Sequence, residues 1–298
     1  MKLVTQKEQH LCEMSTVYGW SEDIGIHALA SVANSLAAEG GRCLGVGVKI
    51  MYPLCADKSR IYRTEKKIKN ICKERNIEIL ESVIRANPML EVPAVTINGL
   101  GSQTTDCGEA TDEKLKYHGG TEDGRSIVQT KWIGMDGMLQ IAKAKEDELK
   151  GRFSPAFIRQ ILSHRQALFS DKEIEVAKAM GVSVMRQITE GGIFAALWEL
   201  AKESRKGLLV DMKKILVLQE TIEVCEHFRM NPYQLTSAGS FLMVTDDGEA
   251  LADALVQKGI PASVIGCFTD SHDKMIKNGE DVRYLDRPAP DEIFKLYG

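Results

Sequence analysis

Two hydrophobic periods alternate along the chain, and they predict its helices and strands. Residues 22–40 and 59–75 repeat apolar side chains at helical spacing. The first of these segments ends in Gly40 and Gly41, which is a typical helix stop. Residues 44–52 alternate and are rich in β-branched side chains, a pattern typical of a strand. Further strands are predicted at 77–84, 92–99 and 126–133, and a helix is predicted to follow Gly134.

The second half of the chain repeats this alternation. Gly191 and Gly192 precede an apolar helical pattern in the segment IFAALWELAKES. Alternating helices and strands favour an α/β or α+β fold, and a length of 298 residues favours two domains. We expect their boundary in the charged, helical stretch 146–181, which divides the chain into domains 1–160 and 161–298. The patterns also predict helices at 219–228 and 248–258, strands at 240–245 and 261–267, and a hairpin turn at Asn278-Gly279.

Composition limits the classes of function. The chain is 44% hydrophobic with a formal net charge of −4 and both signs interspersed, so no basic surface for nucleic acid is indicated. No apolar run approaches the ~20 residues that span a bilayer, and the first residues lack the apolar core of a signal peptide. The seven cysteines show no CxxC spacing, which indicates reduced thiols in a cytoplasmic protein rather than a zinc ribbon. Cys107 lies in a polar segment and is expected to be inert, the alternative being a reactive, accessible thiol.

One candidate site is the segment Thr189-Glu190-Gly191-Gly192, which precedes a predicted helix. Free N–H groups and the helix dipole at such a position favour an anion. The alternative is that the two glycines only permit a tight turn between a strand and a helix. Glu190 would repel a phosphate unless its carboxylate faces away or holds a metal ion.

A second candidate is the segment Gly134–Gly137, which has the same setting between a strand and a helix. Within it, Asp136 is either a metal ligand or a first-turn residue stabilised by the helix dipole, and the structural role is favoured. Asn34 on the first predicted helix needs hydrogen-bond partners if it is buried. His27, on the same helix, either lines a cleft or packs at an interface, and the second is favoured. The six histidines show no metal-ligand spacing, so no protein metal site is predicted.

Five segments resemble landmarks of the AIR-synthase/HypE superfamily, the PurM-like proteins that also include thiamine-phosphate kinase and selenophosphate synthetase. The fourth segment is similar to the signature that opens the C-terminal domain of that family. The resemblance covers about residues 22–268 in a common order, and it is strongest to HypE-like hydrogenase maturation factors. The segments are DIGIHALASVANSLAAEGG (23–41), VGVKIMYP (46–53), VQTKWIGMDG (128–137), VMRQITEGGIFAALWELA (184–201) and CEHFRMNPYQLTSAGSFLMVT (225–245).

The resemblance implies a fold, an assembly and a site. Family members pair through N-terminal α/β domains whose sheets close into a barrel, and a C-terminal α/β domain packs beside them. A homodimer is therefore expected, together with a protein partner in a maturation complex. ATP and Mg²⁺ bind in the family's cleft, and no catalytic residue can be assigned. The resemblance places eight cofactor-binding residues in one shared cleft: Asn34, Gly134, Asp136, Gly137, Thr189, Glu190, Gly191 and Gly192.

Several family positions are altered in this chain. No glycine–acid cluster for Mg²⁺ precedes residue 22, and the family's Asn-Asp pair reads Asn34-Ser35. Gln187 stands where the second-domain signature has Asp, and residues 237–239 read Ser-Ala-Gly where HypE has Asn-Glu-Gly. HypE ends in a cysteine that receives a carbamoyl group, whereas the last cysteine here is Cys267. A triphosphate needs metal and donor groups to offset its charge, so these changes predict weak catalytic use of ATP.

Three functions remain open at this point. The chain is an ATP-dependent maturation factor of the HypE-like group, or a catalytically degenerate dimeric scaffold or binding protein. The third alternative is a protein whose site binds an anionic ligand without ATP hydrolysis. Fold alone does not choose among them, because function depends on the site.

Overall fold

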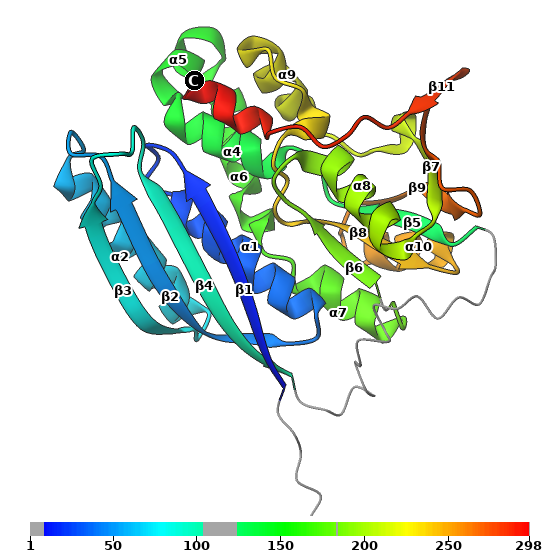
Figure 1. The fold of residues 1–298 in the computed structure, drawn as a ribbon. Helices are drawn as coiled ribbons and strands as arrows, with labels where there is room; N and C mark the ends of the chain where they lie inside the picture. Colours follow the sequence, from blue (N-terminus) through cyan, green and yellow to red (C-terminus); the bar gives the residue numbers. More distant parts are fainter. Residues whose placement is uncertain (1–8, 104–123, 183, 298) are drawn as a thin grey trace, which may run out of the picture.

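The computed structural model describes residues 9–103, 124–182 and 184–297, which form two β-sheets with their covering helices (Figure 1). Cys107 lies outside these residues. The first part contains β1 (Gln9–Tyr18), α1 (Ile24–Ala38), β2 (Arg42–Tyr52), α2 (Lys58–Glu74), β3 (Glu78–Ala86) and β4 (Ala94–Gln103). The second part begins with β5 (Ser126–Thr130), α4 (Met135–Ala144), α5 (Glu146–Arg152), α6 (Pro155–Ser163), η1 (His164–Leu168) and α7 (Asp171–Ala179).

The remaining elements complete the second part of the chain. Within the described ranges, no helix is long and apolar enough to cross a membrane. The elements are β6 (Val184–Ile188), α8 (Gly192–Ser204), β7 (Gly207–Asp211), η2 (Met212–Lys214), α9 (Gln219–Phe228), η3 (Pro232–Gln234), β8 (Ser240–Thr245), α10 (Gly248–Gln257), β9 (Ala262–Thr269), β10 (Lys274–Asn278), β11 (Asp281–Tyr284) and η4 (Glu292–Leu296).

The first sheet has four strands in the order β1-β4-β2-β3. Helices α1 and α2 cover one of its faces (Figure 1). Alternate strand residues meet the apolar stripes of these helices, because side chains alternate across a strand with a period of two. Leu29, Leu36, Ile50, Ile68 and Ile97 are fully buried in the resulting core. β1 lies at an edge of this sheet and runs antiparallel to β4.

The second sheet has seven strands in the order β11-β10-β7-β9-β5-β8-β6. Consecutive strand residues serve opposite faces of this sheet. On one face, Ile127 and Leu242 pack in a core with the helix α8. On the other, Val128 and Phe241 pack in a second core with the helices α7 and α10. β5 and β8 are therefore buried on both sides, which explains their nearly continuous apolar sequences.

A further apolar cluster joins the two parts of the molecule. Ile26 and Ala30 of α1 pack with Met135 and Met138 of α4 and with residues of α6 and α9. The opposite face of α1 packs on the first sheet. Helix α1 is therefore shared between two cores, and it fixes the position of one sheet relative to the other.

The predicted α/β class and most predicted elements are confirmed, including 219–228 and 240–245 with their predicted bounds. β1 is absent from the predicted elements, although Leu11 and Val17 on it pack into the first core. The domain division near residue 160 stays a prediction. The two sheets, however, change earlier in the chain, because β5 (126–130) already pairs with β8 and β9 of the second sheet.

Candidate functional site

Glycines start both helices that the sequence singles out. Gly134 precedes α4 with φ of 66°, and Gly191 and Gly192 precede and open α8 with φ of 80° and 65°. These left-handed conformations favour glycine because they strain residues that have a Cβ atom. At Gly192 space is also lacking, since a Cβ atom would lie 2.5 Å from the carbonyl oxygen of Tyr233. These conformations fit the tight-turn interpretation of residues 189–192, and Asp136 lies in the first turn of α4, as the structural interpretation of residues 134–137 expects.

The amide groups at these helix starts already have acceptors within the chain. Gly191 N–H donates to Oδ2 of Asp291 at 2.7 Å, and Gly192 N–H donates to the carbonyl oxygen of Thr189 at 3.1 Å. Gly134 N–H donates to Oγ of Ser237 at 2.7 Å. Gly137 N–H likewise donates to the carbonyl oxygen of Thr236 at 3.0 Å. These four groups are therefore engaged, and an anion would have to displace the internal acceptors.

Asn34 belongs to a buried polar network rather than to a cavity wall. Its Nδ2 donates to the carbonyl oxygen of Leu168 at 2.8 Å and to Oε1 of Gln187 at 3.1 Å. Its Oδ1 accepts from the N–H of Ser170 at 2.9 Å. Gln187 then donates back to α1, at the carbonyl oxygen of Ser31 and at Oγ of Ser35. The side-chain amides of Asn34 and Gln187 thus connect α1 with β6 of the second sheet.

A cavity of about 390 Å³ lies between the edge strand β1, helix α1 and three turns of the second part. Asp136, Thr189 and Glu190 line it together, so three of the eight predicted residues share one cavity wall. Asn34 and the four glycines do not line it, although the glycines position the lining turns. The remaining lining residues are Glu13, Met14, Ser15, Thr16, Val17, Tyr18, His27, Ser31, Val32, Ser35, Thr236 and Ala238.

His27 and Asp136 form a buried pair at this cavity. Nδ1 of His27 lies 2.5 Å from Oδ1 of Asp136, and both residues are at most 3% exposed. Oδ2 of Asp136 accepts from Oγ1 of Thr236 at 2.8 Å and from Nε2 of Gln140 at 3.0 Å. A carboxylate is an acceptor, so Nδ1 of His27 donates to Asp136. Among the described residues, Nε2 has no hydrogen-bond partner.

The cavity is acidic. Glu13, Asp136 and Glu190 line it, and no lysine or arginine does so among the residues that the structure describes. Partial burial, and then the Glu13 carboxylate, raise the pKa of Glu39 to about 7. Like charges that lie close together raise one another's pKa in this way. Within the described part of the chain, the negative charge of Glu13 and Glu39 therefore has no lining lysine or arginine to offset it.

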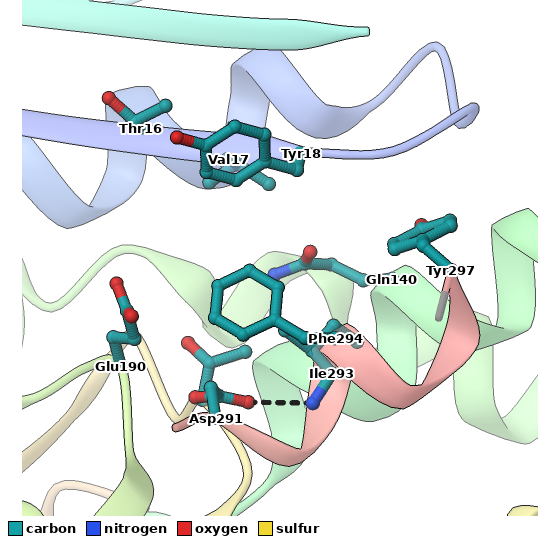
Figure 2. Close-up of a pocket in the computed structure, with 10 residues that line it drawn as sticks. Thr16, Val17, Tyr18, Gln140, Glu190, Asp291, Ile293, Phe294 and Tyr297 are labelled. Atoms are coloured by element: carbon teal, nitrogen blue, oxygen red, sulfur yellow. Dashed lines mark hydrogen bonds between the residues drawn. The ribbon is translucent and has the colours of Figure 1, made fainter. Parts of the chain in front are cut away.

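The C-terminal segment closes one side of the cavity region. Asp291 is 2% exposed and accepts from the N–H groups of Gly191 and Ile293. Burial raises the pKa of Asp291 to about 6 and outweighs these hydrogen bonds, which lower it. Figure 2 shows Asp291 below β1 and Glu190 directed toward that strand, across a small adjoining cavity of about 40 Å³. Phe294 of η4 reaches Tyr18 of β1, with ring centroids 6.1 Å apart.

Sequence reasoning did not single out Glu13, Thr236 or Asp291. Their roles come from long-range contacts, which no local pattern in the sequence indicates. The described residues contain no group of three or more potential ligands that could hold a metal ion. The four glycine amides at the two helix starts are engaged and no described lysine or arginine lines the cavity, so the described residues do not fit Mg-ATP and we derive no step through it.

The sequence was compared with protein families and characterised relatives. The family model of the AIR synthase related protein, C-terminal domain, matches residues 122–277. A putative hydrogenase expression/formation protein of Methanocaldococcus jannaschii is 22% identical over 280 residues, which cover 91% of this chain and 78% of the relative. The carbamoyl dehydratase HypE of Cupriavidus necator is 23% identical over 264 residues, which cover 87% of this chain and 70% of the relative.

Solved structures of HypE show the same fold. E. coli HypE matches with a TM-score of 0.73 and 16% identity over 94% of this chain and 87% of the other. HypE in complex with ATP matches with a TM-score of 0.69 and 17% identity over 95% and 87%. A HypE–HypF complex contains a chain that matches with a TM-score of 0.68 and 18% identity over 96% and 92%. At these identities the likeness concerns the fold.

Proposed function

This chain belongs to the AIR synthase-related protein family, and on that premise we propose that it is a HypE-like maturation protein that binds a small ligand without hydrolysing ATP. In this proposal the cleft between the two sheets is a binding site, and the protein acts as a dimeric scaffold or binding partner. The relatives support the maturation context, since one is named a putative hydrogenase expression/formation protein and HypE itself is named a hydrogenase maturation protein in a solved structure.

The observation that carries the proposal is the contact between Gly191 and Asp291. Helix α8 begins at a position where the free amides and the dipole would favour a phosphate. The chain places its own carboxylate there, 2.7 Å from the amide nitrogen of Gly191. Asp291 thus occupies the position of an anionic ligand, and Glu190 beside it adds further negative charge to the cleft.

A homodimer and a protein partner belong to the same proposal. The described helices leave one face of the four-stranded sheet open, and Leu80 on β3 is 55% exposed there. A second copy would cover such a face, as the resemblance implies. The HypE–HypF complex supports a protein partner in a maturation assembly, because HypE in that complex shares this fold.

ATP turnover is the direct test. We expect the purified protein with Mg-ATP to release no phosphate above a no-protein control, and sustained release would contradict the proposal. In a parallel arm, Asp291→Ala frees the Gly191 amide. Its affinity for inorganic phosphate should rise above that of the wild type if Asp291 excludes anions from this position. Equal phosphate affinity in both proteins would contradict the role given to Asp291.

The assembly has its own test. Light scattering after size exclusion should give twice the chain mass of 33.0 kDa. Leu80→Glu should shift the protein toward the monomer, because it places a charge on the open sheet face. Val256→Glu is the matched control, since Val256 is 54% exposed on α10. A monomeric wild type would contradict the dimer.

An ATP-dependent enzyme is the second candidate. It is favoured by the HypE structure that was solved in complex with ATP and that shares the fold of this chain. Saturating Mg-ATP would then stabilise the protein by about 2.7 kcal/mol at a hundredfold excess over Kd. Stabilisation together with phosphate release would favour this candidate over the first.

A further inference from the structure

We infer that the cavity between β1 and α1 binds a linear organic cation with a positively charged nitrogen near each end, such as a di- or triamine. This inference names the ligand class of the proposed binding site, and it therefore rests on the proposed function. It differs from the sequence-based expectation of an anionic ligand.

The shape of the cavity is the first step. Along α1 its wall contains His27, Ser31 and Ser35, at intervals of four residues. With 1.5 Å per residue, this wall is about 12 Å long. Along β1 the wall runs continuously from residue 13 to residue 18, or about 17 Å at 3.3 Å per residue. The cavity is thus an elongated groove beside the edge strand.

Negative charge lies at both ends of this groove. Glu13 lies beside Glu39, the residue after the last turn of α1, as the effect of Glu13 on the pKa of Glu39 shows. Glu190 lies toward the other end, because it also lines the small cavity with Tyr18 and Asp291. Among the described residues, the Glu190 carboxylate forms no hydrogen bond or ion pair. A ligand with one charge could neutralise only one of these two ends.

Unpaired acceptors between the two ends provide an independent indication of a ligand. His27 is 3% exposed and lines the groove, and its Nε2 has no hydrogen-bond partner among the described residues. Ser31 is 8% exposed, and its hydroxyl group also lacks a partner within the described part of the chain. Neither atom is fully enclosed by protein, so both face the groove and are open to a ligand. The N–H groups of an amine are donors, and a serine hydroxyl oxygen or an imidazole nitrogen without a proton accepts them.

Other places in the molecule give weaker support for a ligand site. The groove near Arg42 and Arg75 has about 520 Å³, but its charges are mixed and Arg75 already pairs with Asp171. Nε2 of half-buried His164 has no hydrogen-bond partner within the described ranges, but it lies 3.9 Å from Oε1 of Glu220, which suits an ion pair rather than a ligand. The groove beside β1 is therefore where charge, shape and unpaired groups agree.

Calorimetric titration with spermidine, putrescine and butylamine tests the inference on the wild-type protein. We expect spermidine and putrescine to bind at least about tenfold more tightly than butylamine, because a charged hydrogen bond forms at each end only with a dication. Glu13→Gln and Glu190→Gln should each weaken spermidine binding about tenfold and bring its affinity toward that of butylamine. Both side chains lie at the rim of the groove, so thermal unfolding should show that the variants stay folded.

Glu280→Gln is the matched control. Glu280 is an exposed carboxylate in the turn between β10 and β11, at the opposite edge of the second sheet from β6. Its replacement should leave spermidine affinity unchanged. Equal losses in all three variants would mean nonspecific attraction to an acidic protein, and would overturn the inference. An absence of spermidine binding to the wild type would do the same.

Nitrogen NMR gives a second readout. The Nε2 resonance of His27 should shift when spermidine is added, and it should not shift with ATP at the same ionic strength. No shift at saturating spermidine would place the amine elsewhere and overturn the assignment. These results are separable from the proposed function, since ATP turnover would contradict that function whether or not spermidine binds.

Discussion

Two polar regions meet on helix α1. In one the polar groups are paired within the chain, and in the other some acceptors are left unpaired by the residues that the structure describes. The sealed network consists of Asn34, Lys131, Ser170, Glu173 and Gln187. Glu173 forms an ion pair with Lys131, and the other four residues form hydrogen bonds within the chain. The open groove, lined by Glu13, His27, Ser31, Asp136 and Glu190, leaves acceptors unpaired. Both regions lie between the two sheets, so burial between domains does not explain the difference.

The two regions differ because the sealed network contains a buried cation that donates hydrogen bonds, and the described part of the groove contains none. In the sealed network, Nζ of Lys131 donates to the carbonyl oxygens of Ala167 and Phe169 at 2.6 and 2.9 Å and pairs with Glu173. Burial lowers the pKa of Lys131, and Glu173 opposes that shift. The groove has no such group among the described residues. The comparison teaches that neighbouring stretches of α1 differ: one pairs its polar groups with the second part of the chain, and the other leaves acceptors in the groove unpaired.

Lys131→Met is expected to have the largest effect. It leaves the Glu173 carboxylate buried without its cation, which should lower the free energy of unfolding by about 3–5 kcal/mol. Urea denaturation measures this change. The double variant Lys131→Met/Glu173→Leu should recover part of the loss, because it removes the unpaired charge as well. A single variant within about 1 kcal/mol of the wild type would remove the distinction between the two regions.

Asn34→Ala should follow, with a loss of about 3 kcal/mol, because it leaves several buried groups without partners. Those groups are the carbonyl oxygen of Leu168 and the N–H of Ser170. Ser35→Ala is a matched control on the same helix, and it removes only one acceptor for Gln187. Denaturant titration should therefore give the control a smaller loss. Equal losses would contradict the central place of Asn34 in the sealed network.

Asp291 is intermediate between the sealed network and the open groove, because its carboxylate is buried and hydrogen-bonded but has no cationic partner in the described part of the chain. Its folded pKa of about 6 lies above the ordinary aspartate value of 3.8, so the folded state favours the protonated form. The associated stability is present below about pH 4 and is lost as the pH rises through 6. Relative to Asp291→Asn, the wild type should lose on the order of 2 kcal/mol over that range. Unfolding titrations at several pH values measure this, and parallel curves for the two proteins would contradict it.

Glu190→Gln should have the smallest effect on folding. The Glu190 side chain is exposed and forms no ion pair among the described residues, so the free energy of unfolding should change by less than about 0.5 kcal/mol. Thermal unfolding without ligand measures this. A large loss of stability would show that Glu190 stabilises the fold, as the residues of the sealed network do.

Local patterns in the sequence were sufficient for most of the fold. Helix and strand periods placed α9 and β8 at their observed bounds, and the glycine pairs marked the starts of α4 and α8. These signals depend on residues a few positions apart, which is why a single sequence contains them. β1 was missed because its polar residues Glu13, Ser15 and Thr16 hide the alternation of its apolar ones.

Asp23 illustrates the limit of such local reasoning. Capping of the first helix accounts for its position in the sequence, yet its side chain makes no cap hydrogen bond. It pairs instead with Lys67 at 2.7 Å, and this partner lies 44 residues further along the chain. A capping residue and a long-range ion pair look alike in sequence, because both are an acidic residue before a helix.

The sequence by itself determined the α/β class, the helix starts and the apolar faces, because these follow from neighbours along the chain. Only the tertiary structure decided that the Gly191 amide is taken by Asp291, 100 residues away, and that His27 meets Asp136 across 109 residues. Whether a helix start is free for an anion, or a carboxylate has a cation, depends on groups that the fold brings from distant positions. No local periodicity indicates contacts between residues about 100 positions apart. The unpaired charge of the groove is therefore visible only in the tertiary structure.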